Sequence, residues 1–123
     1  MDLVKILIYA YVVFFVAAGI NHFLQPQFYD SIVPSFIPFP RFVHQFTGLI
    51  EIVLPFFLLT KYRKEAALLM IIFLVFIYGA NLYVWINNLP YGGRYFSTQQ
   101  HIFRLFLQVV YIYLTYVIYM YES

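Results

Sequence analysis

The sequence contains no cysteine among its 123 residues. A disulfide, a thiolate nucleophile, an iron–sulfur cluster and a haem held by a thiolate each need a sulfur atom that cysteine supplies. The composition therefore excludes all four kinds of site. Whatever polar chemistry the chain supports must come from its charged, amide, imidazole and hydroxyl side chains.

Charged residues are also scarce. They make up 10% of the chain, whereas 64% of the residues are hydrophobic. Ordinary soluble domains contain roughly 25% charged residues, so this composition is typical of a membrane protein. The net charge of +2 is small and the basic residues form no long patch, so we expect no nucleic-acid partner. The length suits one compact unit, and we expect a single domain over residues 1–123.

Four apolar runs are each close to the roughly 20 residues that span the hydrocarbon core of a bilayer. They cover residues 3–24, 42–60, 66–87 and 101–120. Small residues at 17–19 resemble a signal-peptide cleavage site, but the apolar run continues beyond them, which favours a retained helix. We therefore expect an all-α membrane protein, a four-transmembrane-helix bundle.

The short loop 61–65 predicts the orientation of this bundle. It holds three of the seven Lys and Arg residues, and loops rich in these residues lie on the cytoplasmic side. Both termini are then cytoplasmic as well, and segments 25–41 and 88–100 face outward. The expected location is the cell membrane, as a multi-pass protein.

The outer segment 25–41 is rich in proline. It contains Pro26, Pro34, Pro38 and Pro40. Pro26 suits the first turn of a helix, whereas the later prolines forbid a continuous one. We expect a short helix over residues 26–33 followed by an extended apolar connector that caps the bundle. The pattern leaves open whether this connector is a rigid link or a lid over a ligand.

Glu51 is the only charged residue in the second apolar run, and Arg104 is the only one in the last. A charge at the bilayer centre costs roughly 2.5–3.5 kcal/mol on insertion scales and usually faces the interior of a bundle. At about 1.5 Å of rise per residue, both lie in the outer half: Glu51 is level with Gln108, and Arg104 is about one turn nearer the outer surface, at a level similar to Asn81. We therefore predict an ion pair between Glu51 and Arg104 within one polar cluster.

Several short motifs follow one another in a particular order along the chain. They are His22-Phe23, Pro26, Phe28, Ile32-Val33-Pro34, Ile37-Pro38-Phe39-Pro40, Gly48, Glu51, Ala80-Asn81, Arg104-Leu105 and Gln108. In this order they resemble the DoxX-like family of small integral membrane proteins. The chain departs from that family at Phe106, where a proline is frequent.

The DoxX-like resemblance implies the four-helix fold and two different kinds of activity. The family is named after a small subunit of a membrane thiosulfate:quinone oxidoreductase, and its distant relatives include a receptor-assembly chaperone. Because these roles differ in class, the resemblance does not establish whether the chain is an enzyme, and we assign no catalytic residue.

The first functional hypothesis is an accessory subunit or binding module for a quinone, or a similar lipophilic ligand, in membrane-linked redox metabolism. Asn81, Arg104 and Gln108 would donate hydrogen bonds to a ligand oxygen. His22 or His44 would carry a proton, and Glu51 would orient Arg104. A mostly apolar pocket with a few convergent polar groups is the usual form of a small-molecule site.

The second hypothesis is a scaffold or assembly chaperone for other membrane proteins, in which the polar cluster is purely structural. The partner would be another membrane protein, and Gly or Ala faces would also suit a second copy of the chain. A metal site is not expected, although three histidines lie near the outer helix ends, because no two of them lie four apart on one helix.

Overall fold

The computed structural model describes residues 2–91 and 93–121. Five helices lie within these residues: α1 (Leu3–Leu24), α2 (Pro26–Asp30), α3 (Pro40–Phe57), α4 (Arg63–Ile86) and α5 (Thr98–Met120). The described residues form no strand, although isolated bridges join Tyr91 to Pro34 and to Arg94. The predicted all-α fold class is confirmed.

Local sequence signals account for where the helices begin. The Asp2 carboxylate accepts a hydrogen bond from the backbone N–H of Val4 at 2.9 Å, which caps α1. Ser97 and Gln100 form a capping box at the start of α5. Both α2 and α3 have a proline in the first turn, where the missing N–H costs nothing.

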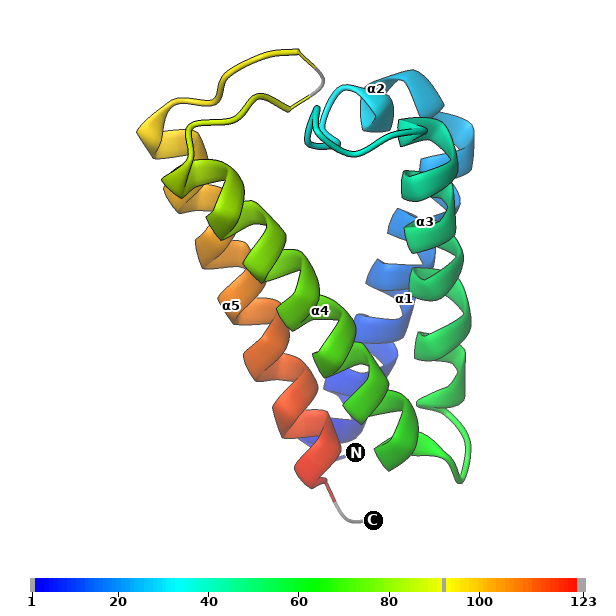
Figure 1. The fold of residues 1–123 in the computed structure, drawn as a ribbon. Helices are drawn as coiled ribbons and strands as arrows, with labels where there is room; N and C mark the ends of the chain where they lie inside the picture. Colours follow the sequence, from blue (N-terminus) through cyan, green and yellow to red (C-terminus); the bar gives the residue numbers. More distant parts are fainter. Residues whose placement is uncertain (1, 92, 122–123) are drawn as a thin grey trace.

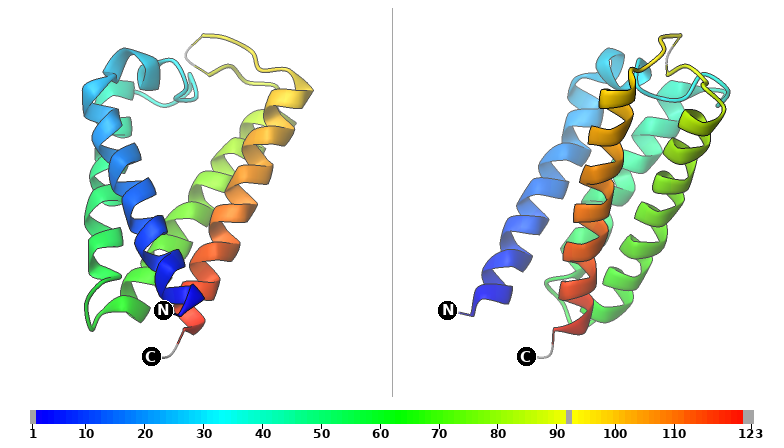
Figure 2. Two further views of the ribbon diagram at one scale, coloured as in Figure 1. Left: turned by 180° about the vertical axis from the view of Figure 1, so that it is seen from behind. Right: turned by 90° about the vertical axis from the view of Figure 1, so that its left-hand side faces the viewer.

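The four long helices form two antiparallel pairs that meet in a V. Helix α1 packs along α3, and α4 packs along α5 (Figure 1). The pairs converge near the two chain termini and diverge toward α2 and the segment that joins α4 to α5 (Figures 1 and 2). We call these the closed end and the open end of the bundle.

An apolar cluster holds the two pairs together at the closed end. Its buried members come from α1, α4, α5 and the turn after α3: Ile8, Tyr11, Val12, Phe15, Leu58, Ala66, Ala67, Met70, Leu74 and Ile118. One hydrogen bond, from Tyr11 Oη to Thr115 Oγ1 at 2.6 Å, also joins α1 to α5 there. Among the described residues, the open end has no comparable apolar cluster.

Two glycines set the spacing inside the first pair. A Cβ atom on Gly19 would lie 2.5 Å from the backbone oxygen of Gly48, and a Cβ atom on Gly48 would lie 2.7 Å from His22 Cβ. Any larger side chain would push α1 away from α3. Close approach of the two backbones therefore depends on these two positions.

Three helices, α1, α4 and α5, are long and apolar enough to cross a membrane. Helix α3 is not among them, because its 18 residues include Arg41, His44 and Glu51. The structure thus indicates a membrane protein with three such helices, and the predicted second span is not confirmed. The observed helices also begin two or three residues earlier than predicted at α3, α4 and α5.

The proline-rich connector differs from the prediction in two ways. Helix α2 ends at Asp30 rather than continuing to residue 33, because the Ser31 hydroxyl bonds the Phe28 carbonyl and Pro34 follows. Residues 31–39 then form successive turns instead of an extended strap; one turn is closed by a hydrogen bond from Ile37 N to Pro34 O at 3.0 Å.

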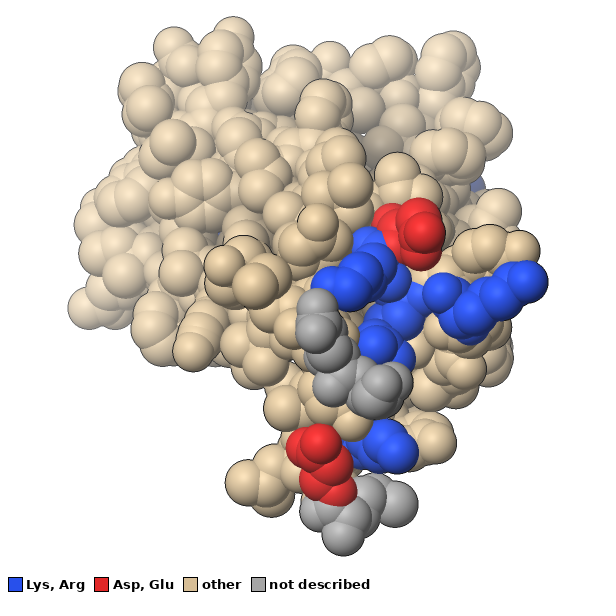
Figure 3. Space-filling model, turned by 90° about the horizontal axis from the view of Figure 1, so that it is seen from below, with Lys and Arg blue, Asp and Glu red and all other residues tan. Residues whose placement is uncertain are grey.

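Basic side chains gather at the closed end, which Figure 3 shows from below. There the Arg63 guanidinium donates to the Tyr121 carbonyl at 3.1 Å, and the Lys64 ammonium donates to the Tyr119 carbonyl at 3.0 Å. Carbonyls at a helix C-terminus lack partners within the helix, so these contacts satisfy them. The start of α4 therefore stabilises the end of α5.

Candidate functional site

A cavity of about 610 Å³ lies between the two helix pairs toward the open end. This volume is within the range of roughly 300–1,000 Å³ that is typical of small-molecule sites. All six residues predicted from the sequence line the cavity: His22, His44, Glu51, Asn81, Arg104 and Gln108. Most of the remaining lining is aromatic or aliphatic, and Val33, Pro34 and Ile37 of the connector contribute to it.

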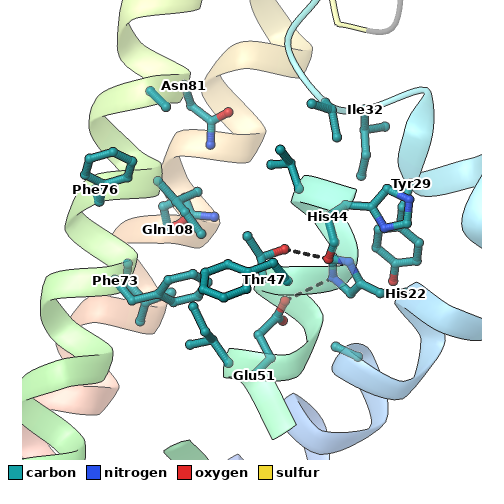
Figure 4. Close-up of a pocket in the computed structure, with 18 of the residues that line it drawn as sticks. His22, Tyr29, Ile32, His44, Thr47, Glu51, Phe73, Phe76, Asn81 and Gln108 are labelled. Carbon is teal, nitrogen blue, oxygen red and sulfur yellow. Dashed lines mark hydrogen bonds and ion pairs between the residues drawn. The ribbon is translucent and has the colours of Figure 1, made fainter. Parts of the chain in front are cut away.

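The wall formed by α1 and α3 carries a contact between a histidine and a carboxylate (Figure 4). His22 Nε2 lies 3.0 Å from Glu51 Oε2, and these side chains are only 10% and 14% exposed. Tyr29 of α2 stacks on the His22 ring with centroids 3.9 Å apart. Because Gly48 lets α1 come close, His22 reaches Glu51 one turn farther along α3.

A second histidine–carboxylate pair lies above the first. Asp30 Oδ1 is 2.7 Å from His44 Nε2, and Asp30 Oδ2 is 2.9 Å from Arg41 Nη2. The Arg41 guanidinium holds the pKa of the Asp30 carboxyl below its usual value, through its hydrogen bonds. This cluster ties α2 to the first turns of α3 and thereby positions the connector over the cavity.

The opposite wall, formed by α4 and α5, is organised around Asn81. Its Oδ1 accepts hydrogen bonds from the Tyr91 hydroxyl at 2.7 Å and from Arg104 Nη2 at 3.3 Å. The Arg104 guanidinium lies over the rings of Tyr91 and Phe96, 4.8 and 5.5 Å from their centroids. Burial raises the pKa of the Tyr91 phenol, so this group stays a hydrogen-bond donor.

Several buried polar atoms around the cavity have no hydrogen-bond partner among the described residues. They are Nδ1 of His22, Nδ1 of His44, Nδ2 of Asn81, Nε of Arg104 and Oε1 of Gln108. The great majority of buried polar atoms in native proteins are bonded, because an unmet donor or acceptor costs free energy. These five atoms belong to residues that line the cavity.

The predicted ion pair between Glu51 and Arg104 is wrong. Glu51 pairs with His22 on the adjacent helix, whereas Arg104 bonds Asn81. The reason is that the helix pairs diverge at this level, so each side chain meets its partner within its own pair. The expectation that Glu51 orients Arg104 is corrected in the same way.

The histidines do not gather in one place. The His22 and His44 rings lie 5.6 Å apart, but His101 stacks on Trp85 of α4 with centroids 5.5 Å apart. Within residues 2–91 and 93–121, no group of three His, Cys, Asp or Glu side chains is arranged to hold a metal ion.

Comparison with protein families was made on the whole chain. Residues 12–119 match the model of a family described as Domain of unknown function (DUF8561). The chain belongs to this family. The DoxX-like resemblance is therefore wrong, and the activities that it implied for this chain lose that support. No curated protein and no solved structure matches this DUF8561 chain.

Two residues of the DUF8561 site had not been predicted from the sequence. Tyr91 lies in the segment between helices, where no periodicity indicates which way a side chain faces, yet it is fully buried against Asn81. Asp30 offered a usable signal, because it is the only acidic residue between Gln25 and Arg41. Its pairing with His44 depends on the fold of the connector.

Proposed function

We propose that this DUF8561 member is an integral membrane protein that binds a lipophilic small molecule with oxygen acceptor groups in the cavity between its helix pairs. The observation that carries the proposal is the set of unpartnered polar atoms in the walls of an otherwise apolar cavity. Such a protein would act as a binding module or accessory subunit. Quinones belong to this ligand class, although the family resemblance that singled them out does not hold.

The geometry suggests distinct roles for the two walls. Asn81 Nδ2 and Arg104 Nε are donors suited to a ligand oxygen. On the other wall, a His22 ring that donates Nε2–H to Glu51 leaves Nδ1 as an acceptor. A ligand that bridges the walls would thus meet donors on one side and a proton acceptor on the other.

The binding proposal can be tested with the only tryptophan of the chain. Trp85 lies on α4, one turn beyond Asn81, so a prenylated benzoquinone in the cavity should quench its fluorescence. Saturable quenching is expected for the full chain in detergent. Gln108→Leu should weaken quinone binding by about three- to tenfold, because one hydrogen bond is worth about 0.5–1.5 kcal/mol.

Gln99→Leu is the matched control, since Gln99 is an exposed amide on the same helix and should not affect binding. Gln108 makes no hydrogen bond to another described side chain, so its replacement should leave the fold intact. Equal quenching curves for both variants and the wild type would contradict the proposal. Copurification of a stoichiometric membrane protein, with no bound lipophile, would then favour a scaffold.

We further propose that α3 is a fourth span, with both termini and the loop 58–62 on the cytoplasmic side. Support comes from the Lys and Arg residues at the closed end and from the packing of α3 against α1. Because the chain has no cysteine, single labels are unambiguous. Lys61→Cys should be labelled only from the cytoplasm and Arg94→Cys only from outside; the reverse pattern would overturn this topology.

A further inference from the structure

Arg104 differs from the other charged residues around the cavity because it has no acidic partner. Glu51 is paired with His22, and Asp30 is paired with Arg41 and His44. Within the described residues, no carboxylate lies within 4.0 Å of Arg104; its only bonded oxygen is the neutral Oδ1 of Asn81. A guanidinium remains charged at any pH a protein tolerates, so this positive charge is uncompensated.

The surroundings of Arg104 fix the guanidinium without neutralising it. The rings of Tyr91 and Phe96 hold its face, and the Asn81 oxygen is shared with the Tyr91 hydroxyl. Its Nε is buried and has no hydrogen-bond partner among the described residues, and the same is true of Nδ2 of the adjacent Asn81. One charged donor and one neutral donor on the same wall form a cradle for an anionic oxygen group.

The shape of the cavity indicates what is attached to that group. Between α3 and α4 the cavity is lined by Phe42, Phe46 and Phe76, whose side chains are 70%, 54% and 79% exposed. On the opposite side, Phe14 of α1 contacts Tyr111 of α5 with ring centroids 5.6 Å apart. An apolar chain would therefore leave the cavity between α3 and α4.

We propose that the cavity binds a single-chain amphiphile with a carboxylate head, such as a free fatty acid. The carboxylate lies against Arg104 and Asn81, and the alkyl chain passes between α3 and α4 into the bilayer. The charged N–H of Arg104 favours this head over a neutral oxygen acceptor, because hydrogen bonds between ionised groups are roughly twice as strong as neutral ones. The inference rests on the proposed function and adds to it the charge of the head and the path of the chain.

The decisive experiment compares two ligands of the same chain length. Radiolabelled oleate and oleyl alcohol differ only in the charged head, and their binding to the full chain in nanodiscs at about pH 8 can be measured directly. Oleate should bind at least tenfold more tightly than oleyl alcohol. Arg104→Gln should remove this preference by weakening only oleate, whereas Arg104→Lys should retain part of it.

Two further variants keep the test informative. Arg94→Gln removes an exposed arginine and should leave the preference unchanged. Phe76→Ala should weaken oleate and oleyl alcohol equally, because it shortens the apolar path and not the head site. A lysophosphatidate that binds more tightly than oleate would overturn the carboxylate assignment.

The outcomes separate this inference from the broader proposal. Equal affinity of wild-type protein for oleate and oleyl alcohol, with quinone quenching of Trp85 preserved, would overturn the anionic head and leave the lipophile site standing. Absence of saturable binding for oleate, oleyl alcohol and the quinone probe would overturn both.

Discussion

The two helix pairs of this protein treat their polar residues in opposite ways. On the side of α1 and α3, Glu51 is paired with His22 and Asp30 of α2 is paired with His44, and the helices touch at Gly19 and Gly48. In the pair α4–α5, Arg104 has no acidic partner, and Gly79 has open space beside it. Polar residues on α1 and α3 are thus used to stabilise their own wall of the cavity, whereas those on α4 and α5 can bind a ligand.

The largest expected difference between the two helix pairs is in how their stability responds to one added methyl group. Gly19→Ala should lower the free energy of unfolding by about 3 kcal/mol, the upper end of the range for overpacking, because the new Cβ meets the Gly48 backbone oxygen. Gly79→Ala is the control: with nothing within 4 Å, it should raise stability by roughly 0.5–1 kcal/mol. Thermal unfolding in detergent measures both variants.

Equal stability of the Gly19 and Gly79 variants would show that the close contact between α1 and α3 is not needed. The His22–Glu51 pair would then have to form without the approach that Gly48 permits.

A sharper test asks which partner Glu51 uses. Glu51→Gln and His22→Phe should each lower stability by about 1–3 kcal/mol, because each leaves a buried polar group unmet. Their combination should be non-additive by at least about 0.5 kcal/mol, as is usual for residues in contact. Double-mutant cycles from chemical unfolding in mixed micelles give this coupling energy.

The companion cycle joins Glu51→Gln with Arg104→Gln across the cavity. It should be additive within about 0.3–0.5 kcal/mol, since the two residues share no partner in the structure. Strong coupling in this second cycle and none in the first would restore the pairing predicted from the sequence.

The smallest expected effect is on the pH dependence contributed by Asp30, because its side chain is 29% exposed. Arg41 lowers the pKa of this carboxyl in the folded state, whereas an unfolded Asp titrates at about 3.9. Asp30 therefore contributes stability above about pH 4 that is lost as the pH falls through its folded pKa. Melting temperatures of wild-type protein and Asp30→Asn should converge in acid; a constant difference at all pH values would refute this.

The helices were predictable because the length of each apolar run and its helical periodicity can be read directly from the sequence. Helix α1 has the predicted limits, and the polar residues predicted for the cavity all line it. Helix α3 departs from the prediction because Arg41, His44 and Glu51 lower its hydropathy below that of the other long helices.

The choice of partners was not predictable in the same way. Counting residues along a helix gives the depth of Glu51, but it does not say which neighbouring helix the side chain faces. That choice depends on the close approach at Gly48 and on the divergence of the two pairs, which are properties of tertiary packing.

Because the apolar cluster joins the helix pairs at the closed end, a small rotation there gives a larger displacement at the open end. Asn81 lies eleven residues beyond Met70 on α4, so the arm between them is roughly 16 Å long at about 1.5 Å per residue. A rotation of roughly 5° about Met70 would move Asn81 by about 1.4 Å, enough to make or break a hydrogen bond. The packing of side chains at the closed end therefore affects the width of the cavity at Asn81.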